Sequence, residues 1–387
     1  MSSFDSETFP QLMDTVERFI RQRLMPLERQ VEEKEEVPAE VIEEMKEMGL
    51  FGLGIPEAYG GCELDLMQEL QVQMAFSYTS PAFRLVFWPN VGIGSKGLVL
   101  AGTEAQKRKY LPGLASGELR AAFCLTEPDA GSDAASLKTR AERDGDMLVI
   151  NGTKRFITNA TRANVFTVMA RTDPSRPGAA GISAILVDRD TPGLHVGKSE
   201  KKLGQRGSPI SDVIFENVRV PVSSVIGGEA ALGQGFRIAM QVLDHGRISV
   251  AASGLGMAHR LIDEAARYAV QRKQFGQPIS EFQLVQAMLA DSETEYLAGH
   301  ALVMQAGQAL ARGEDVRNQA AAAKYFCSEA LSRIADRALQ IHGGSGYVAE
   351  HHVERLYRDA RALRIYEGTS QVLQLVIART MLKRYQD

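Results

Sequence analysis

Ile365-Tyr366-Glu367-Gly368-Thr369-Ser370-Gln371 lies close to the C-terminus of the 387-residue chain and opens an apolar helix. Thr369 or Ser370 can cap that helix, and the residues after the cap predict its buried face: Val372, Leu373, Leu375, Val376 and Ile377. A carboxylate held among apolar groups is poorly solvated, so the pKa of Glu367 should rise. Glu367 is therefore a candidate general base, although a glutamate favoured by the helix dipole is the more ordinary interpretation of such a residue alone.

The composition is typical of a soluble globular protein with more than one domain. Hydrophobic residues make up 44% of the chain and charged residues 24%. The net charge of -4 argues against a nucleic-acid partner, and no apolar run approaches the length of a membrane span. The N-terminus lacks the features of a signal peptide. Cys62, Cys124 and Cys327 fit neither a zinc spacing nor a disulfide framework, so we expect a cytoplasmic protein without a metal site.

Three zones that differ in their residue patterns predict a mainly α fold with a central β domain. Residues 1–120 read as a helical domain, with a helix between Pro38 and Gly49, another over 66–78, and a capping box that begins at Thr103. Residues 121–230 contain short β-rich runs separated by turns. Asn151-Gly152 predicts a hairpin there, and the turn density predicts a small antiparallel barrel or sandwich.

The third zone, residues 231–387, predicts a C-terminal four-helix bundle. A long helix over 236–270 should be interrupted around residues 244–246. A capping box of Ser280 and Gln283 should open a second helix that reaches Arg312. A third helix is expected over 316–341, and the fourth begins near residue 370.

The glycine pattern Gly92-Ile93-Gly94-Ser95-Lys96-Gly97 raises the alternative of a nicotinamide dinucleotide site. Such a site needs a strand before the glycines, for which the apolar run 83–88 is the candidate. Pro89 interrupts the approach, and no second strand follows. Close packing of helices is the preferred interpretation of these glycines.

Two further clusters have the character of ligand-binding loops. The run 124–133, Cys-Leu-Thr-Glu-Pro-Asp-Ala-Gly-Ser-Asp, combines a tight turn with many hydrogen-bond donors. Arg155-Phe156-Ile157-Thr158-Asn159 adds an aromatic ring and a hydroxyl group. Together with Gly60-Gly61 and the segments 215–221, 272–276, 340–344 and 366–371, these clusters resemble, in order and over nearly the whole chain, the flavin-dependent acyl-CoA dehydrogenase family.

The resemblance implies bound FAD and assigns residues to it. Phe123, Leu125, Thr126, Phe156 and Thr158 resemble residues that meet the flavin, and Thr369 and Gln371 resemble contacts near the phosphates and ribose of the cofactor. Arg272, Gln274, Phe275, Gln340 and Gly344 resemble residues that reach the FAD of a neighbouring subunit. Phe156 stands where many members of the family have a tryptophan, so an aromatic ring is still available to pack on the flavin, and FAD binding is expected to be kept. The family is usually a homotetramer.

The resemblance also assigns the substrate contacts. Ser132, Asp244, Arg247 and Gly368 resemble residues that meet the acyl-CoA. A sub-branch of the family has its base at the position of Gly246, which cannot serve, so Glu367 is the candidate base. Arg84 stands where glutaryl-CoA dehydrogenases have an arginine that binds a distal carboxylate, which would favour short or polar-ended acyl chains. The alternative is an arginine on a helix face with its head in solvent.

The activity implied is α,β-dehydrogenation of an acyl-CoA to the trans-2-enoyl-CoA. Glu367 would take the α-proton, a hydride would pass to flavin N5, and an electron-transfer flavoprotein would accept the electrons. Alternatives on the same scaffold are an acyl-CoA oxidase, an enoyl-CoA reductase, or an enzyme that acts on a carrier-protein thioester. A non-catalytic helical interaction protein is the alternative from another class.

Overall fold

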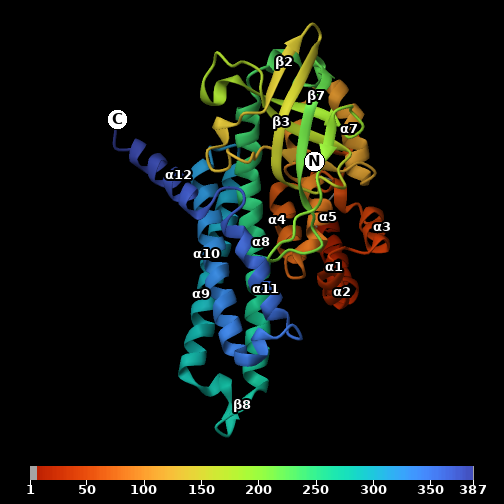
Figure 1. The fold of residues 1–387 in the computed structure, drawn as a ribbon. Helices are drawn as coiled ribbons and strands as arrows, with labels where there is room; N and C mark the ends of the chain where they lie inside the picture. Colours follow the sequence, from red (N-terminus) through yellow and green to blue (C-terminus); the bar gives the residue numbers. More distant parts are fainter. Residues whose placement is uncertain (1–6, 387) are drawn as a thin grey trace.

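The computed structural model describes residues 7–386 and places helices at both ends of the chain around a central sheet (Figure 1). The first part is helical, with α1 (Thr8–Phe19), α2 (Glu28–Lys34), α3 (Ala39–Glu47), α4 (Leu66–Phe76), α5 (Pro81–Val91), α6 (Lys96–Ala101) and α7 (Glu104–Ser116). The capping box at Thr103 is confirmed: its hydroxyl accepts from the backbone N–H of Gln106. The aromatic rings of Phe51, Phe76 and Phe87 pack in the core of this part.

The sheet contains β1 (Ala121–Cys124), β2 (Arg140–Asp144), β3 (Met147–Thr158), β4 (Val165–Arg171), β5 (Ile182–Asp188), β6 (Leu194–Val196) and β7 (Ile210–Pro221). Its strand order is β1-β4-β2-β3-β7-β6, with β5 paired to β4. The fold class is confirmed. In detail, the sheet is mixed, because β1 and β2 each pair in parallel with β4.

The hairpin predicted at Asn151-Gly152 is wrong, because β3 runs straight through these residues. The hairpin turn lies at Gly145, whose φ of 61° suits a tight connection between β2 and β3. At Gly152 the pairing of β3 with β7 shifts in register, as at a β-bulge. A side chain at Gly152 would collide with Thr139, so the glycine serves a close approach of two segments.

The C-terminal part is built on three long helices, α8 (Gly235–Gln271), α9 (Gln283–Ala311) and α10 (Arg317–His342), which pack on one another (Figure 1). The short strands β8 (Lys273–Gln274) and β9 (Gln277–Pro278) connect α8 to α9. Helix α8 is continuous, so the predicted interruption at residues 244–246 is wrong. The predicted capping box is also absent: Phe282 is the N-cap of α9, and it makes no side-chain cap bond.

Two shorter helices complete this part. Helix α11 (His352–Ala360), which the sequence did not predict, packs on α8 and α10. Helix α12 (Ser370–Lys383) starts against α10 and extends away from the body of the chain (Figure 1). The prediction of its buried face is largely wrong: Leu373 is buried, but Leu375 is 54% exposed.

The run 83–88, the strand that a dinucleotide site needs, lies inside helix α5. The nicotinamide alternative is therefore wrong: Gly92 and Gly94 lie between α5 and α6, and Gly97 lies inside α6. A side chain at Gly94 would collide with Pro89 and Ala121, which agrees with close packing. No helix among residues 7–386 is both long and apolar enough to cross a membrane.

Candidate active site

Glu367 lies in the turn that leads into α12 and points its carboxylate at α8. A Cβ atom at Gly246 would fall on Oε2 of Glu367, so the glycine in the middle of α8 is what makes room for the carboxylate. Oε2 is buried and has no hydrogen-bond partner among residues 7–386. Glu367 has a φ of 54°, a left-handed conformation that costs a non-glycine residue on the order of 1 kcal/mol. Packing of the surrounding residues must therefore hold the backbone of Glu367 in this left-handed conformation.

The electrostatic environment of Glu367 matches the sequence-based expectation. Burial raises the pKa of Glu367 to about 7, although the cations Arg247, Lys324 and Arg84 pull it down. These cations come from α8, α10 and α5, so three helices converge on one carboxylate. A group with a pKa near 7 can both take and return a proton under physiological conditions.

The backbone beside this carboxylate also offers a donor. The backbone N–H of Glu367 donates to no backbone carbonyl among residues 7–386. Thr369, predicted to cap α12, does so by accepting from the N–H of Val372 at 3.3 Å. The N–H of Glu367 is a candidate donor to a bound ligand.

Arg84 on α5 is only 4% exposed, so the interpretation that its head lies in solvent is wrong. Burial lowers the pKa of Arg84, while Tyr366 and Glu367 oppose that shift. The Nε of Arg84 and the hydroxyl of Tyr366 are both buried without a hydrogen-bond partner in residues 7–386. Asn159 links the sheet to this helix, because its Nδ2 donates to the carbonyl of Leu85 at 2.8 Å. The structure thus brings a buried guanidinium, whose Nε has no hydrogen-bond partner among residues 7–386, to the candidate base.

Asp244 and Arg247, predicted to meet the acyl-CoA, pair with each other one turn along α8. Arg247 Nη1 lies 2.7 Å from Oδ1 of Asp244, and both side chains are largely buried. Burial raises the pKa of Asp244 although Arg247 opposes it. Because Arg247 also faces Glu367, this pair lies at the edge of the same site.

Sequence reasoning missed a buried cluster behind Gly246. Glu69 on α4 lies 3.2 Å from the Nζ of Lys96 and 3.1 Å from the Nε2 of His245. Burial alone would raise the pKa of Glu69, but Lys96 and His245 outweigh it, so the pKa of Glu69 is lowered. The contact between Glu69 and His245 links α4 to α8 directly beside Gly246, the residue against which the Glu367 carboxylate packs. The sequence around His245 could not reveal this cluster, because its partners Glu69 and Lys96 are distant in sequence and leave no local pattern.

The loop expected to lie along the flavin follows β1 and is held by β3. Lys154 is fully buried and donates to Oε1 of Glu127 at 2.7 Å and to the carbonyl of Leu125 at 3.1 Å. The backbone N–H of Arg155 donates to the carbonyl of Thr126 at 2.8 Å. Every residue from 125 to 127 is thus bonded to β3, which fixes Thr126 relative to that strand.

The other residues predicted to contact the flavin or the substrate in this part of the chain lie near the same loop. Phe156 has a φ of 58° and a ring that is 54% exposed. The guanidinium of Arg155 lies 5.0 Å from the centroid of that ring. Phe123 and Thr158 are half-buried at the ends of β1 and β3, and Ser132 is exposed. An exposed aromatic beside rigid hydrogen-bonding groups fits one face of a flat heteroaromatic ring.

The residues expected to reach a neighbouring subunit's FAD gather elsewhere, around β8. Arg272, Gln274 and Gly344 line a pocket of about 340 Å³ together with Tyr268 and His342. Phe275 at the tip of the β8–β9 connection is 94% exposed, and Gln340 is also exposed. Figure 1 shows β8 at the far end of the long helices from the sheet. One chain therefore does not bring the two groups of predicted cofactor residues together.

Gly368 and Gln371 lie in the turn and first residues of α12, where Gln371 is exposed. Among residues 7–386, no group of three or more His, Cys, Asp or Glu side chains could hold a metal ion.

Comparisons with known proteins agree with this geometry. Models of three acyl-CoA dehydrogenase domains match the chain, the N-terminal domain over residues 6–118, the middle domain over 122–218 and the C-terminal domain over 233–382. The chain is 43% identical over 366 residues to a 3-(aryl)acrylate reductase of Clostridium sporogenes, covering 94% of this chain and 96% of the relative. It is 40% identical to an acyl-CoA dehydrogenase of Bacillus subtilis, covering 95% and 96%.

A third relative is subunit CarC of the caffeyl-CoA reductase-Etf complex of Acetobacterium woodii, at 41% identity over 92% of this chain and 93% of the relative. Among solved structures, butyryl-CoA dehydrogenase from Megasphaera elsdenii has a TM-score of 0.93 at 34% identity, covering 99% and 100% of the two chains. PigA with FAD and proline has a TM-score of 0.93 at 27% identity with the same coverage. The chain is therefore a member of the acyl-CoA dehydrogenase family, an FAD-dependent oxidoreductase that acts on a CH–CH bond.

Proposed function

We propose that this enzyme oxidises an acyl-CoA thioester to the trans-2-enoyl-CoA, with Glu367 as the base that removes the α-proton. The observation that carries the proposal is the buried, unpaired Oε2 of Glu367 above Gly246. A desolvated carboxylate whose pKa is raised, and whose Oε2 has no hydrogen-bond partner among residues 7–386, is suited to take a proton from a bound substrate. Membership of the enzyme family excludes the non-catalytic interaction protein.

The chain's own groups support the other requirements of the reaction. As the α-proton leaves, negative charge grows on the thioester oxygen and needs a donor. The backbone N–H of Glu367 is the candidate donor, and Gly368 beside it lets the thioester approach. Arg247 and Arg84 add positive charge around the same point. Bound FAD would supply the acceptor for the hydride of the β-carbon.

The reverse reaction, reduction of an enoyl-CoA, is the second candidate. The 3-(aryl)acrylate reductase and the caffeyl-CoA reductase subunit are among the relatives, and both names describe reduction. With a pKa of about 7, Glu367 is partly protonated near neutral pH and could give a proton to the α-carbon. The relative named as part of an Etf complex supports an electron-transfer flavoprotein as redox partner.

An assembly of several copies, of which a homotetramer is the expected form, would complete the FAD site. Support comes from the separation of the two groups of cofactor residues and from the exposed apolar side chains of α12 and Phe275. We also propose a cytoplasmic location, which the three free cysteines support.

The test of the proposed function uses the purified, FAD-loaded protein without oxygen. A panel of saturated acyl-CoAs is added, and the visible absorption of the flavin is followed. We expect at least one thioester to bleach the flavin, and the matching enoyl-CoA to restore the colour of chemically reduced enzyme. A protein whose flavin responds to neither class of thioester would contradict the proposal.

Arg84→Ala is expected to discriminate between acyl chains. A charge-assisted hydrogen bond contributes about 1.5–3 kcal/mol, so kcat/KM for glutaryl-CoA should fall roughly 10- to 150-fold more than for butyryl-CoA. Arg84→Met is the matched control, because it keeps an apolar stem in the buried position. Steady-state kinetics with a dye acceptor measure both substrates. Equal losses on butyryl-CoA and glutaryl-CoA would remove the carboxylate role of Arg84.

A further inference from the structure

Lys324 on α10 is a buried cation to which neither the fold nor the proposed chemistry gives a role. Its side chain is 0% exposed, and its Nζ donates to the carbonyl of Gly368 at 2.6 Å. Burial lowers the pKa of Lys324 to about 8, while Glu367 and Glu329 favour its charged form and Arg247 opposes it. A buried ammonium is costly and needs partners to persist. Here one partner is the backbone directly after the candidate base.

The turn that Lys324 contacts is the one that aims Glu367. Glu367 and Gly368 are consecutive left-handed residues, with φ of 54° and 97°. Because Glu367 is not a glycine, its left-handed backbone is strained, and contacts from the surrounding structure must hold it. The hydrogen bond from Nζ of Lys324 to the carbonyl of Gly368 is a tertiary contact that acts directly on this pair of residues.

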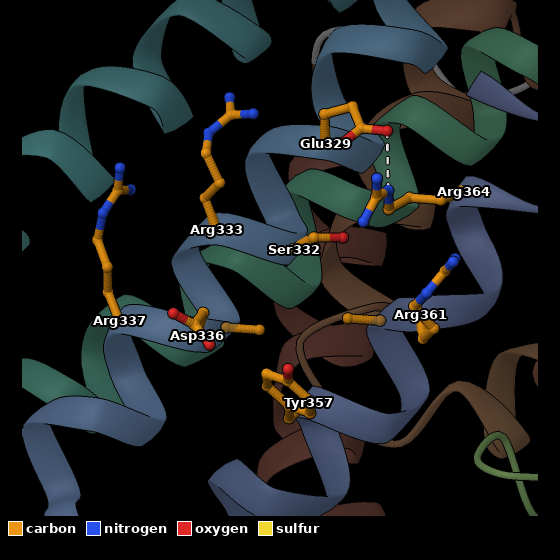
Figure 2. A pocket seen from close by; sticks show the side chains of 10 residues that line it. Glu329, Ser332, Arg333, Asp336, Arg337, Tyr357, Arg361 and Arg364 are labelled. Atoms are coloured by element: carbon orange, nitrogen blue, oxygen red, sulfur yellow. Dashed lines mark hydrogen bonds and ion pairs between the residues drawn. The ribbon is translucent and has the colours of Figure 1, made fainter. Parts of the chain in front are cut away.

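Helix α10 holds the flanks of the same turn at two further points. Oε1 of Glu329 accepts hydrogen bonds from Nε of Arg364, at 2.8 Å, and from the hydroxyl of Ser370. Figure 2 shows the Glu329–Arg364 bond at the edge of a pocket between α10 and α11. Tyr325 accepts from Nε2 of Gln374 at 2.9 Å. The flanks are therefore anchored independently of Lys324, which leaves Lys324 to fix the two central residues.

We propose that Lys324 is a positioning residue for Glu367: its ammonium holds the Gly368 carbonyl and so aims the carboxylate, and its charge favours the ionised base. This inference rests on the proposed role of Glu367. The cations that face Glu367 are Arg247 from α8, Arg84 from α5 and Lys324 from α10. Of these, Lys324 is the one that also bonds the turn, so its removal changes both geometry and charge.

Three substitutions separate the two effects. Lys324→Met removes the donor and the charge, Lys324→Gln keeps a donor without the charge, and Lys324→Arg keeps both. For Lys324→Met we expect kcat to fall on the order of 100-fold with KM little changed, because a small displacement of a reacting group has that effect. Lys324→Gln should lose less rate, and it remains informative if the Met variant fails to fold.

The pH dependence gives a readout that a merely structural role would not move. Dehydrogenation needs ionised Glu367, so the rate rises with pH through the pKa of that group. Loss of a nearby cation raises the pKa, and the rising limb should move up by roughly one pH unit in the Met and Gln variants. In Lys324→Arg the limb should stay in place. A full complement of FAD in each variant confirms that the cofactor site is intact.

A direct titration keeps this test separate from the proposed function. The infrared C=O band of protonated Glu367, identified as the band missing in Glu367→Gln, is followed against pH in the FAD-loaded protein. We expect its midpoint to rise in Lys324→Met relative to wild type. A kcat and a midpoint both equal to wild type in folded Lys324→Met would overturn the proposal. Failure of wild type to respond to any thioester would instead remove the role of Glu367 itself.

Discussion

Glu367→Gln is expected to lose acyl-CoA turnover while the protein stays yellow. General base catalysis contributes about 10²- to 10⁴-fold, so kcat should fall by at least the lower figure. Glutamine has the same shape but cannot take a proton, and the residues predicted to contact FAD are other ones. The measurement is dye reduction with the best thioester of the panel, together with the visible spectrum of the variant.

The same substitution should raise thermal stability. Oε2 of Glu367 is buried without a partner, and an unpaired buried charge-bearing group destabilises the folded state. Replacing it with a neutral amide removes part of that cost, a trade between stability and activity that is common at active sites. Glu47→Gln on the exposed side of α3 is the control and should change neither property. Turnover of Glu367→Gln within tenfold of wild type would mean that the base lies elsewhere.

Lys154→Met is expected to destabilise the protein more than any other single change considered above. Lys154 is fully buried and pairs with Glu127, whose pKa it keeps low even though burial alone would raise it. Removing one partner of a buried ion pair costs about 3–5 kcal/mol, because the other charge stays buried and unpaired. The loop that carries Thr126 also loses its bond from Lys154 to Leu125. Weaker FAD binding should accompany the loss of stability.

A double variant makes this prediction specific. Glu127 also accepts from the backbone N–H groups of Lys138 and Thr139, so Glu127→Gln can keep one of these bonds without a charge. Combining it with Lys154→Met should recover part of the lost melting temperature, which identifies the uncompensated carboxylate as the cause. Lys198→Met on the surface is the control and should stay within about 0.5 kcal/mol of wild type. A single Lys154→Met variant as stable as this control would contradict the account.

The parts of the site that are local in sequence could be predicted. Glu367, its glycine neighbour and the cap at Thr369 are consecutive, and the helix signal after them is strong. Lys324 could not be found in this way. Lys324 follows a run of alanines at 320–323 on a helix, a context in which a lysine is expected to be exposed to solvent. Its hydrogen-bond partner is a backbone carbonyl 44 residues away, and a backbone carbonyl has no sequence signature.

The errors in the fold have the same origin. Asn151-Gly152 has the local chemistry of a hairpin, but pairing with β7 on one side and contact with Thr139 on the other keep the strand extended. Gly246 reads as a break in α8, yet it is the residue that makes room for Glu367. The apolar face of α12 was correctly recognised as apolar, but one chain does not bury it. In each case a tertiary or intermolecular contact overrides the local preference.

The measurement that tests the role of Glu367 most directly is exchange of the substrate's α-proton with solvent deuterium. Acyl-CoA is incubated in deuterium oxide with FAD-loaded wild type or Glu367→Gln, without an electron acceptor, and deuterium at the α-carbon is read by mass spectrometry. The account predicts uptake with wild type and none above background with the variant. Deuterium uptake by Glu367→Gln at the wild-type rate would contradict it.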